Sequence, residues 1–200
     1  MSRKDELRIR ISSLVKGMSA AEKDAESVSC VGKIISMREF QEADCVLCYM
    51  ALENEVNVRA VVEEALRLNK TVALPKVVAD MECMVFYRVS PARPLESQLE
   101  TGAWGIREPV SSEDSMMGLE SFAGLRVFAV VPGVAFSATG ERLGHGKGFY
   151  DKFFNSLLSE ENEKRPAGVF CAGACFKCQK VDSVPVSPTD VPVDVVVCAD

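Results

Sequence analysis

The chain has 200 residues, of which 48% are hydrophobic and 26% are charged, so it can bury a sizeable globular core. Its formal net charge of −6 argues against general binding to nucleic acid or to an anionic membrane, because no excess of Lys and Arg is available to neutralise phosphates. The polar start at residues 1–6 and the break of the most apolar run by Pro132 and Gly133 argue against a signal peptide and a membrane span. We therefore expect a single cytoplasmic domain over residues 1–200.

Two helices are predicted at the start of the chain. Apolar residues recur at helical spacing among charges between Lys4 and Lys16, which indicates an amphipathic helix. The sequence Ser19-Ala-Ala-Glu22 has the form of a capping box and predicts a second helix that runs to about Met37.

Strands and helices then alternate. A buried strand is predicted over 44–50, a helix over 58–68 and a short strand over 71–75. Strand, helix, strand is the unit from which parallel sheets are built. A third strand at 84–87 precedes an irregular stretch, 90–118, which contains the single tryptophan, Trp104. The remaining predicted elements are a strand at 125–131, a glycine-rich loop at 132–148, a helix at 149–158, and strands at 167–172 and 195–198. This order predicts an α/β fold with three layers, an open and mostly parallel sheet flanked by helices.

The glycine-rich loop has the features of a phosphate site. Gly144, Gly146 and Gly148 alternate between a buried strand and a helix start, so that backbone N–H groups and the positive end of the helix can face an anion. Arg142 and Lys147 add full charges. The loop matches neither the Walker A pattern nor G-x-G-x-x-G, and an ordinary connector with solvated cations remains the alternative.

The eight cysteines have two interpretations. Several lie within apolar runs, which indicates buried thiols. The pairs Cys45-x-x-Cys48 and Cys175-x-x-Cys178 also imitate the halves of a zinc site. Against zinc, an i, i+3 spacing in a strand points the two side chains to opposite faces.

Several motifs together resemble those of the 5-formyltetrahydrofolate cyclo-ligase family, over nearly the whole chain. The loop reads Pro-Gly-Val-Ala-Phe at 132–136, followed by Arg-Leu-Gly-His-Gly-Lys-Gly-Phe-Tyr-Asp at 142–151. The other matching segments are Lys4-Asp-Glu-Leu-Arg8, Tyr49-Met-Ala-Leu-Glu-Asn-Glu55, Leu74-Pro75-Lys76, Gly105-Ile106-x-Glu108-Pro109 and Asp190-Val-Pro-Val-Asp194. The resemblance implies a fold like those of sugar-phosphate isomerases and CoA-transferases.

The resemblance also implies an enzyme that uses ATP and Mg²⁺ to convert 5-formyltetrahydrofolate to 5,10-methenyltetrahydrofolate, through a phosphorylated formyl group. Arg142 and Lys147 would then act on the transferred phosphoryl group, and Asp151 and Asp190 would hold Mg²⁺. The implied nucleotide-binding residues are Lys4, Arg8, Arg142, Leu143, Gly144, His145, Gly146, Lys147, Gly148, Phe149 and Tyr150. The implied folate-binding residues are Met50, Glu55, Trp104 and Tyr150. We expect a monomer that binds no nucleic acid and no membrane.

Two positions depart from the family pattern. His145 stands between the glycines where relatives carry Arg or an aromatic residue, and its protonation is expected to raise ATP affinity as the pH falls. Ser137 stands where many relatives have Asp, and no role is assigned to it. The alternative functions are an ATP-independent phosphate-handling enzyme of a similar fold and a non-catalytic module that binds folate or zinc.

Overall fold

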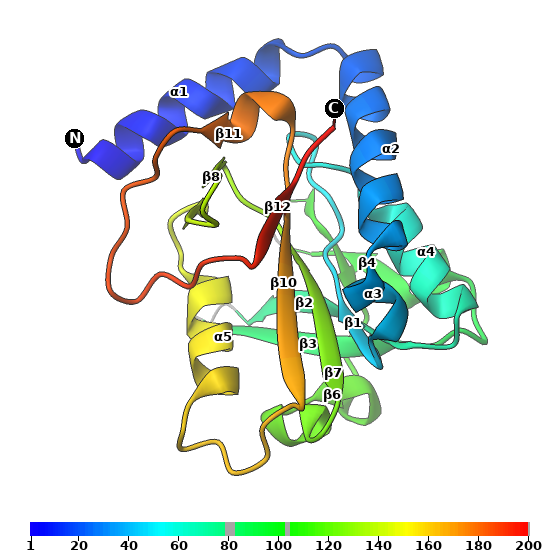
Figure 1. Cartoon of the computed structure of the whole chain (residues 1–200). Helices are drawn as coiled ribbons and strands as arrows, with labels where there is room; N and C mark the ends of the chain where they lie inside the picture. The colour runs from blue at the N-terminus through cyan, green and yellow to red at the C-terminus, as the bar shows by residue number, and fades with distance from the viewer. Residues whose placement is uncertain (79–82, 103–104, 200) are drawn as a thin grey trace.

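A mixed sheet lies at the centre of the fold (Figure 1). In the computed structural model, which describes residues 1–78, 83–102 and 105–199, seven strands pair in the order β12-β10-β7-β1-β2-β3-β6. Their bounds are β1 (Cys45–Leu47), β2 (Thr71–Val78), β3 (Cys83–Val89), β6 (Met116–Met117), β7 (Arg126–Val131), β10 (Gly168–Ala174) and β12 (Val195–Val197). The pairings from β12 to β2 are parallel, whereas β3 pairs antiparallel with both β2 and β6. The predicted α/β fold with a mostly parallel sheet is therefore confirmed. The antiparallel pairing at the β3–β6 edge was not predicted.

Helices cover both faces of this sheet and make three layers. The helices are α1 (Arg3–Gly17), α2 (Ala20–Ser36), α3 (Arg38–Glu42), α4 (Arg59–Arg67) and α5 (Phe149–Leu158). Neighbouring residues of β1 alternate between two cores, because Val46 packs with α2, α3 and α4 while Leu47 packs with α5. Figure 1 shows α5 on one side of the sheet and α2, α3 and α4 on the other. None of the described helices is long and apolar enough to cross a membrane.

The helix starts follow the sequence closely. The Ser19 side chain accepts from the N–H of Glu22, and the Glu22 carboxylate accepts from the N–H of Ser19, so the predicted capping box is confirmed. Ser2 and Asp5 form a second capping box at the start of α1. The helix predicted over 149–158 has those bounds in the structure.

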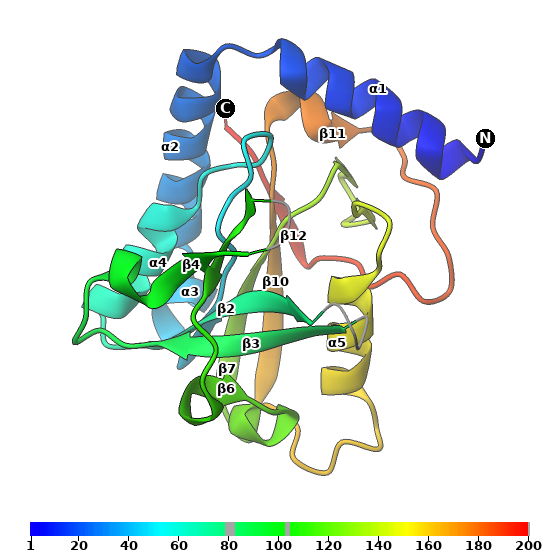
Figure 2. The ribbon, with the colours of Figure 1, turned by 180° about the vertical axis from the view of Figure 1, so that it is seen from behind.

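Two segments contain more regular structure than predicted. The stretch 90–118 contains the hairpin of β4 (Leu99–Thr101) and β5 (Arg107–Pro109), with η2 (Leu95–Gln98) and η4 (Glu113–Ser115), and Figure 2 shows the hairpin beside β2 and β3. Trp104 lies outside the described residues. The glycine-rich segment contains the antiparallel strands β8 (Ala135–Ser137) and β9 (Arg142–Leu143), and β11 (Lys180–Val181) pairs with β8. The remaining short helices are η5 (Leu119–Phe122) and η6 (Lys177–Gln179).

The strand β2 is longer than predicted because it continues past Pro75. A proline cannot donate a ladder hydrogen bond, so it is tolerated where a strand has a neighbour on one side only. β1 pairs with β2 only as far as Ala73, and Pro75 therefore lies where β2 pairs with β3 alone.

The cysteine arrangement argues against the zinc interpretation. All eight cysteines are free thiols. Cys45 lies in the core beneath α5 and Cys48 in the core beneath α2 and α4, on opposite faces of the sheet. The two therefore cannot ligate one metal ion, as the strand periodicity predicted.

Candidate functional site

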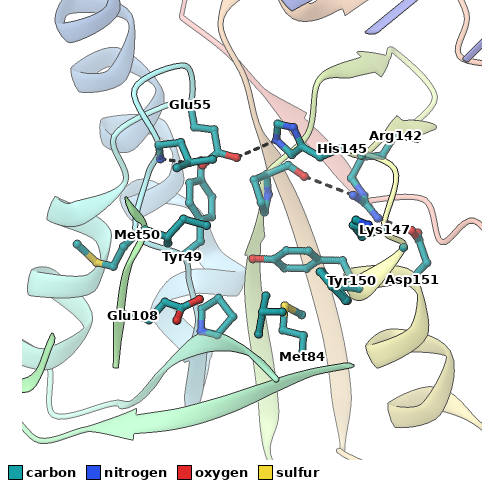
Figure 3. Close-up of a pocket in the computed structure, with 18 of the residues that line it drawn as sticks. Tyr49, Met50, Glu55, Met84, Glu108, Arg142, His145, Lys147, Tyr150 and Asp151 are labelled. Atoms are coloured by element: carbon teal, nitrogen blue, oxygen red, sulfur yellow. Dashed lines mark hydrogen bonds and ion pairs between the residues drawn. The ribbon is translucent and has the colours of Figure 1, made fainter. Parts of the chain in front are cut away.

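A cavity of about 500 Å³ lies at the carboxyl ends of β1 and β7 (Figure 3). In parallel sheets this end of the strands is where ligands bind, because the connecting loops open a crevice there. Its lining residues come from four regions: Tyr49, Met50, Leu52 and Glu55 after β1; Pro75, Val77 and Met84 from β2 and β3; Ile106, Arg107 and Glu108 at β5; and Pro132, Arg142, Gly144, His145, Lys147, Gly148, Phe149, Tyr150 and Asp151 from the glycine-rich segment and α5.

One wall of the cavity is a cationic loop that ends at the start of α5. Gly146 and Gly148 have φ values of +108° and +67°, a region that favours glycine. Gly148 is the N-cap of α5, and no side chain caps the first N–H groups of that helix. Lys147 is exposed at the cavity and forms no ion pair with any residue that the structure describes. Free N–H groups, a helix start and an unpaired ammonium together form an anion site.

Arg142 is the buried cation of this wall. Its side chain is 4% exposed, and its Nη2 donates to Oδ1 of Asp151 at 2.7 Å. The guanidinium lies over the ring of Tyr150, at 5.7 Å from the centroid. Its Nε is a buried donor with no hydrogen-bond partner among the described residues. A phosphate oxygen that enters the cavity would supply the acceptor that this N–H lacks.

Residues from both ends of the chain support the loop from outside. Nε of Arg8, in α1, donates to the carbonyl oxygen of Gly144 at 3.0 Å. Nζ of Lys4 lies 2.6 Å from Oδ2 of Asp190 and 2.9 Å from the hydroxyl of Ser187. These side chains are therefore brought to the loop, although Lys4, Arg8 and Asp190 do not line the cavity.

Asp151 and Asp190, the two residues predicted to bind a metal, are neighbours in the structure. Oδ1 of Asp151 accepts from the N–H of Val191 at 3.1 Å, so the residue after Asp190 is held against Asp151. Each carboxylate also pairs with a cation, Asp151 with Arg142 and Asp190 with Lys4. In each case the other carboxylate oxygen has no hydrogen bond from the described residues.

These two carboxylates fit a magnesium ion only with help from a ligand. No group of three or more His, Cys, Asp or Glu side chains among the described residues could hold a metal. Mg²⁺ accepts one or two carboxylates when phosphate oxygens and water complete its octahedron. The donor set therefore suits a metal that arrives with a nucleotide better than a resident one.

The opposite wall is mostly apolar. Met50, Pro75, Val77 and Met84 line it, and Glu55 lies at its edge. Oε2 of Glu55 accepts from the N–H of Leu52 at 3.0 Å. A flat ligand would therefore meet apolar side chains on its face and a carboxylate at its rim.

Two tyrosines lie between the walls. Burial raises the pKa of Tyr150 well above its ordinary value, so its hydroxyl stays protonated and can act as a hydrogen-bond donor in the cavity. The hydroxyl of Tyr49 donates to the carbonyl oxygen of Val56 at 3.0 Å, which ties the loop after β1 to the strand end.

The structure places most of the predicted site residues at one cavity. Ten of them line it: Met50, Glu55, Arg142, Gly144, His145, Lys147, Gly148, Phe149, Tyr150 and Asp151. Leu143 packs in the core, and Gly146 lies against the Arg8 guanidinium outside the cavity. Trp104 lies outside the described residues. Ser137 is buried and its hydroxyl accepts from the N–H of Glu141 at 3.1 Å, so it stabilises the β8–β9 turn.

Several lining residues had no role predicted from the sequence. Three of them lie within the motifs noted above but had no predicted role: Pro75, Ile106 and Glu108. No sequence pattern pointed to Met84 or Arg107 as a site residue. These residues belong to β2, β3 and β5 or, for Ile106, directly precede β5, and only the tertiary fold brings them opposite the glycine-rich loop.

Comparison with known proteins gives one consistent result. The model of the family described as the 5-formyltetrahydrofolate cyclo-ligase family matches residues 1–199. A Caenorhabditis elegans protein named probable 5-formyltetrahydrofolate cyclo-ligase is 31% identical over 97% of this chain and 91% of its own length. A mouse 5-formyltetrahydrofolate cyclo-ligase is 25% identical over 100% of this chain and 95% of its own.

Solved structures with the same fold carry a related name. The NMR structure of 5,10-methenyltetrahydrofolate synthetase from Aquifex aeolicus has a TM-score of 0.75 and 32% sequence identity, and the match covers 98% of this chain and 89% of that one. A 5,10-methenyltetrahydrofolate synthetase from Mycoplasma pneumoniae has a TM-score of 0.70 over the whole of both chains, but its 20% identity supports the fold alone.

Proposed function

The chain belongs to the 5-formyltetrahydrofolate cyclo-ligase family, and we propose that it converts 5-formyltetrahydrofolate to 5,10-methenyltetrahydrofolate with consumption of ATP. The observation that carries this proposal is the pairing of two unlike walls in one cavity. Arg142, Lys147 and the start of α5 form a wall for phosphate, and it faces an apolar wall with a carboxylate at its edge. ATP and a folate fit these two walls in that order.

The triphosphate binds along the glycine-rich loop. The contacting residues are Arg142, Leu143, Gly144, His145, Gly146, Lys147, Gly148, Phe149 and Tyr150, with Lys4 and Arg8 behind the loop. Lys147 and the Nε of Arg142 support this proposal, since neither has a partner within the described residues. Leu143 contributes through its backbone, because its side chain is in the core.

The folate lies between the walls, with its pterin on Met50 and its N–H donors toward Glu55. Tyr150 packs on the folate, and we propose the same role for Trp104, which lies outside the described residues. The formyl oxygen then faces the loop, where it attacks the γ-phosphorus of ATP and ADP leaves. N10 next attacks the activated formyl carbon, the C–O bond breaks, and phosphate leaves with the former formyl oxygen. N10 loses its proton in this step. Arg142 and Lys147 lower the barrier because they offset charge on the transferred phosphoryl group without covalent chemistry.

Asp151 and Asp190 would hold Mg²⁺ through the carboxylate oxygens that accept no hydrogen bond from the described residues. The ion would supply additional positive charge beside the phosphates. Arg142 and Lys4, which pair with these carboxylates, fix their positions in the absence of the ion.

The test is a spectroscopic assay for the methenyl product. Purified protein is mixed with 5-formyltetrahydrofolate, Mg²⁺ and ATP, and the methenyl absorbance band is followed beside a sample without ATP. We expect the band to grow only in the sample with ATP. A folded protein that forms no methenyl product would refute the activity, and product formation without ATP would refute the role of the nucleotide.

A further inference from the structure

Glu108 is a buried carboxylate in the cavity wall to which neither the sequence motifs nor the proposed chemistry gives a role. It lies in the short strand β5, and only 3% of the residue is exposed. Figure 3 shows its carboxylate directed toward the cavity, across from Tyr150 and Arg142.

This carboxylate has no hydrogen-bond or ion-pair partner within the part of the chain that the structure describes. The cation on the adjacent strand, Lys76, pairs with Glu100 and donates to the carbonyl oxygen of Pro109 instead. Glu100 and Glu108 face each other across the β4–β5 ladder, so one of two like charges is neutralised and the other is not. A buried carboxylate without a donor costs free energy that a bound ligand can recover.

The backbone leaves room for the carboxylate at this position. A Cβ atom added at Gly102 would collide with Oε2 of Glu108. Gly102 starts the turn between β4 and β5, and its N–H donates to the carbonyl oxygen of Ile106 at 2.8 Å. The absence of a side chain at Gly102 therefore permits the conformation that points Glu108 at the cavity.

The charge distribution of the cavity selects the kind of group that Glu108 binds. The cations Arg142 and Lys147 lie on the loop wall, and phosphates would be repelled from the side of Glu108. Arg107, the cation next to Glu108 in the lining, pairs with Glu96. Other side chains of this wall, including Pro75, Val77 and Ile106, are apolar and suit the face of a flat ring. A carboxylate at the edge of such a slot accepts hydrogen bonds from N–H groups.

We propose that Glu108 is a second specificity residue for the folate and accepts hydrogen bonds from N–H groups of the reduced pterin that Glu55 leaves free. This inference rests on the proposed function, since it assumes that the pterin occupies this cavity. Glu55 already accepts from Leu52 and lies against His145, whereas neither oxygen of Glu108 has a partner among the described residues. The ring is then held from two sides, by carboxylates on different elements.

The test uses Glu108→Gln in the full chain, with Glu113→Gln as control because Glu113 is an exposed glutamate outside the cavity. Calorimetric titration measures the affinity for 5-formyltetrahydrofolate and, separately, for ATP. A hydrogen bond to a charged group predicts a loss of folate affinity of about tenfold or more in Glu108→Gln, with ATP affinity unchanged. Thermal unfolding of the ligand-free variant should occur at the same or a higher temperature, because the change removes a buried carboxylate that no described residue pairs with.

Two further measurements make the assignment specific. Gly102→Ala should weaken folate binding in the same way, because it displaces the Glu108 carboxylate. 5-Formyltetrahydropterin, which lacks the p-aminobenzoylglutamate tail, should lose affinity by the same factor as the full folate in Glu108→Gln. An equal affinity of wild type and Glu108→Gln for the folate would overturn the proposal, as would a loss seen with the full folate but not with the pterin. Wild-type protein that fails to bind 5-formyltetrahydrofolate would instead refute the proposed function.

Discussion

Nε2 of His145 lies 3.1 Å from Oε1 of Glu55, so the residue between the loop glycines contacts the carboxylate on the opposite wall. The histidine side chain is 57% exposed, whereas that of Glu55 is 9% exposed. The contact spans the two loops that form the rim of the cavity (Figure 3). His145 is one of the two departures from the family pattern, and its observed partner belongs to the folate wall rather than the nucleotide wall.

We predict from this contact that His145 limits the access of the pterin to Glu55. His145→Ala frees Oε1 of Glu55, so 5-formyltetrahydrofolate should bind the variant more tightly than wild type, by a few-fold. Calorimetry is the measurement, and equal or weaker folate binding in His145→Ala would contradict this role of His145. ATP titrations of the same samples test whether His145 also contributes to ATP binding.

Replacement of Lys147 should remove activity and preserve the fold. The side chain is exposed and has no ion-pair partner among the described residues, so Lys147→Ala should leave the unfolding free energy within about 0.5 kcal/mol. The turnover number should fall by about 100-fold or more, because the lysine offsets charge on the transferred phosphoryl group. Lys164→Ala, at an exposed lysine after α5, is the control. Turnover equal to wild type in Lys147→Ala would refute the catalytic role.

Much of the fold could be predicted because its signals are local. The capping box at Ser19 and the helix at 149–158 depend on residues within a few positions of each other, and both were predicted correctly. The direction in which β3 pairs is a tertiary property that no local pattern encodes. The β4–β5 hairpin was likewise missed, because its strands of three residues are too short to show periodicity.

The site likewise contains residues that the local sequence marks and residues that only the tertiary structure identifies. The alternate glycines and the cations Arg142 and Lys147 mark the phosphate wall within one short segment. Lys4 and Arg8 have the pattern of a solvated helix face, and only the resemblance placed them at the loop, where Arg8 contacts Gly144. Glu108 could not be assigned a role from its spacing, because what distinguishes it is burial without a partner in the part of the chain that the structure describes.

Replacement of Asp151 and replacement of Asp190 should lower the unfolding free energy by different amounts, but both should weaken the response of the enzyme to Mg²⁺. Asp151→Ala leaves Arg142, which is 4% exposed, without a counter-charge and should lower the unfolding free energy by about 3 kcal/mol. Asp190→Ala breaks the ion pair with Lys4, whose side chain is 25% exposed. This change should lower the unfolding free energy by about 1 kcal/mol or less. Both variants should need more Mg²⁺ for half-maximal product formation. Urea unfolding and Mg²⁺ titration of the assay measure the two effects, and wild-type magnesium dependence in both would refute their role as ligands.

Stability toward acid should depend on Asp44. Hydrogen bonds from the Arg126 side chain, at 2.8 and 3.0 Å, hold the pKa of Asp44 well below its usual range. A carboxyl with a depressed folded-state pKa stabilises the fold above its unfolded pKa of about 3.9, and this contribution is lost as the pH falls further. Asp44→Asn should therefore lower the melting temperature by about 1–2 °C at pH 7, and the difference should shrink below about pH 4. A difference that is constant from neutral to acid pH would contradict the assignment.

The cysteines should divide by burial in their reaction with iodoacetamide. Burial raises the pKa of four thiols to about 12, which leaves almost no reactive thiolate at neutral pH: Cys30, Cys45, Cys48 and Cys171. Cys83 and Cys198 are partly exposed and should react first. Brief alkylation followed by mass spectrometry measures the order, and the same treatment in urea should label all eight thiols. Rapid labelling of Cys45 in the native protein would show that the core beneath α5 opens, and it would contradict the interpretation of this cysteine as a buried thiol.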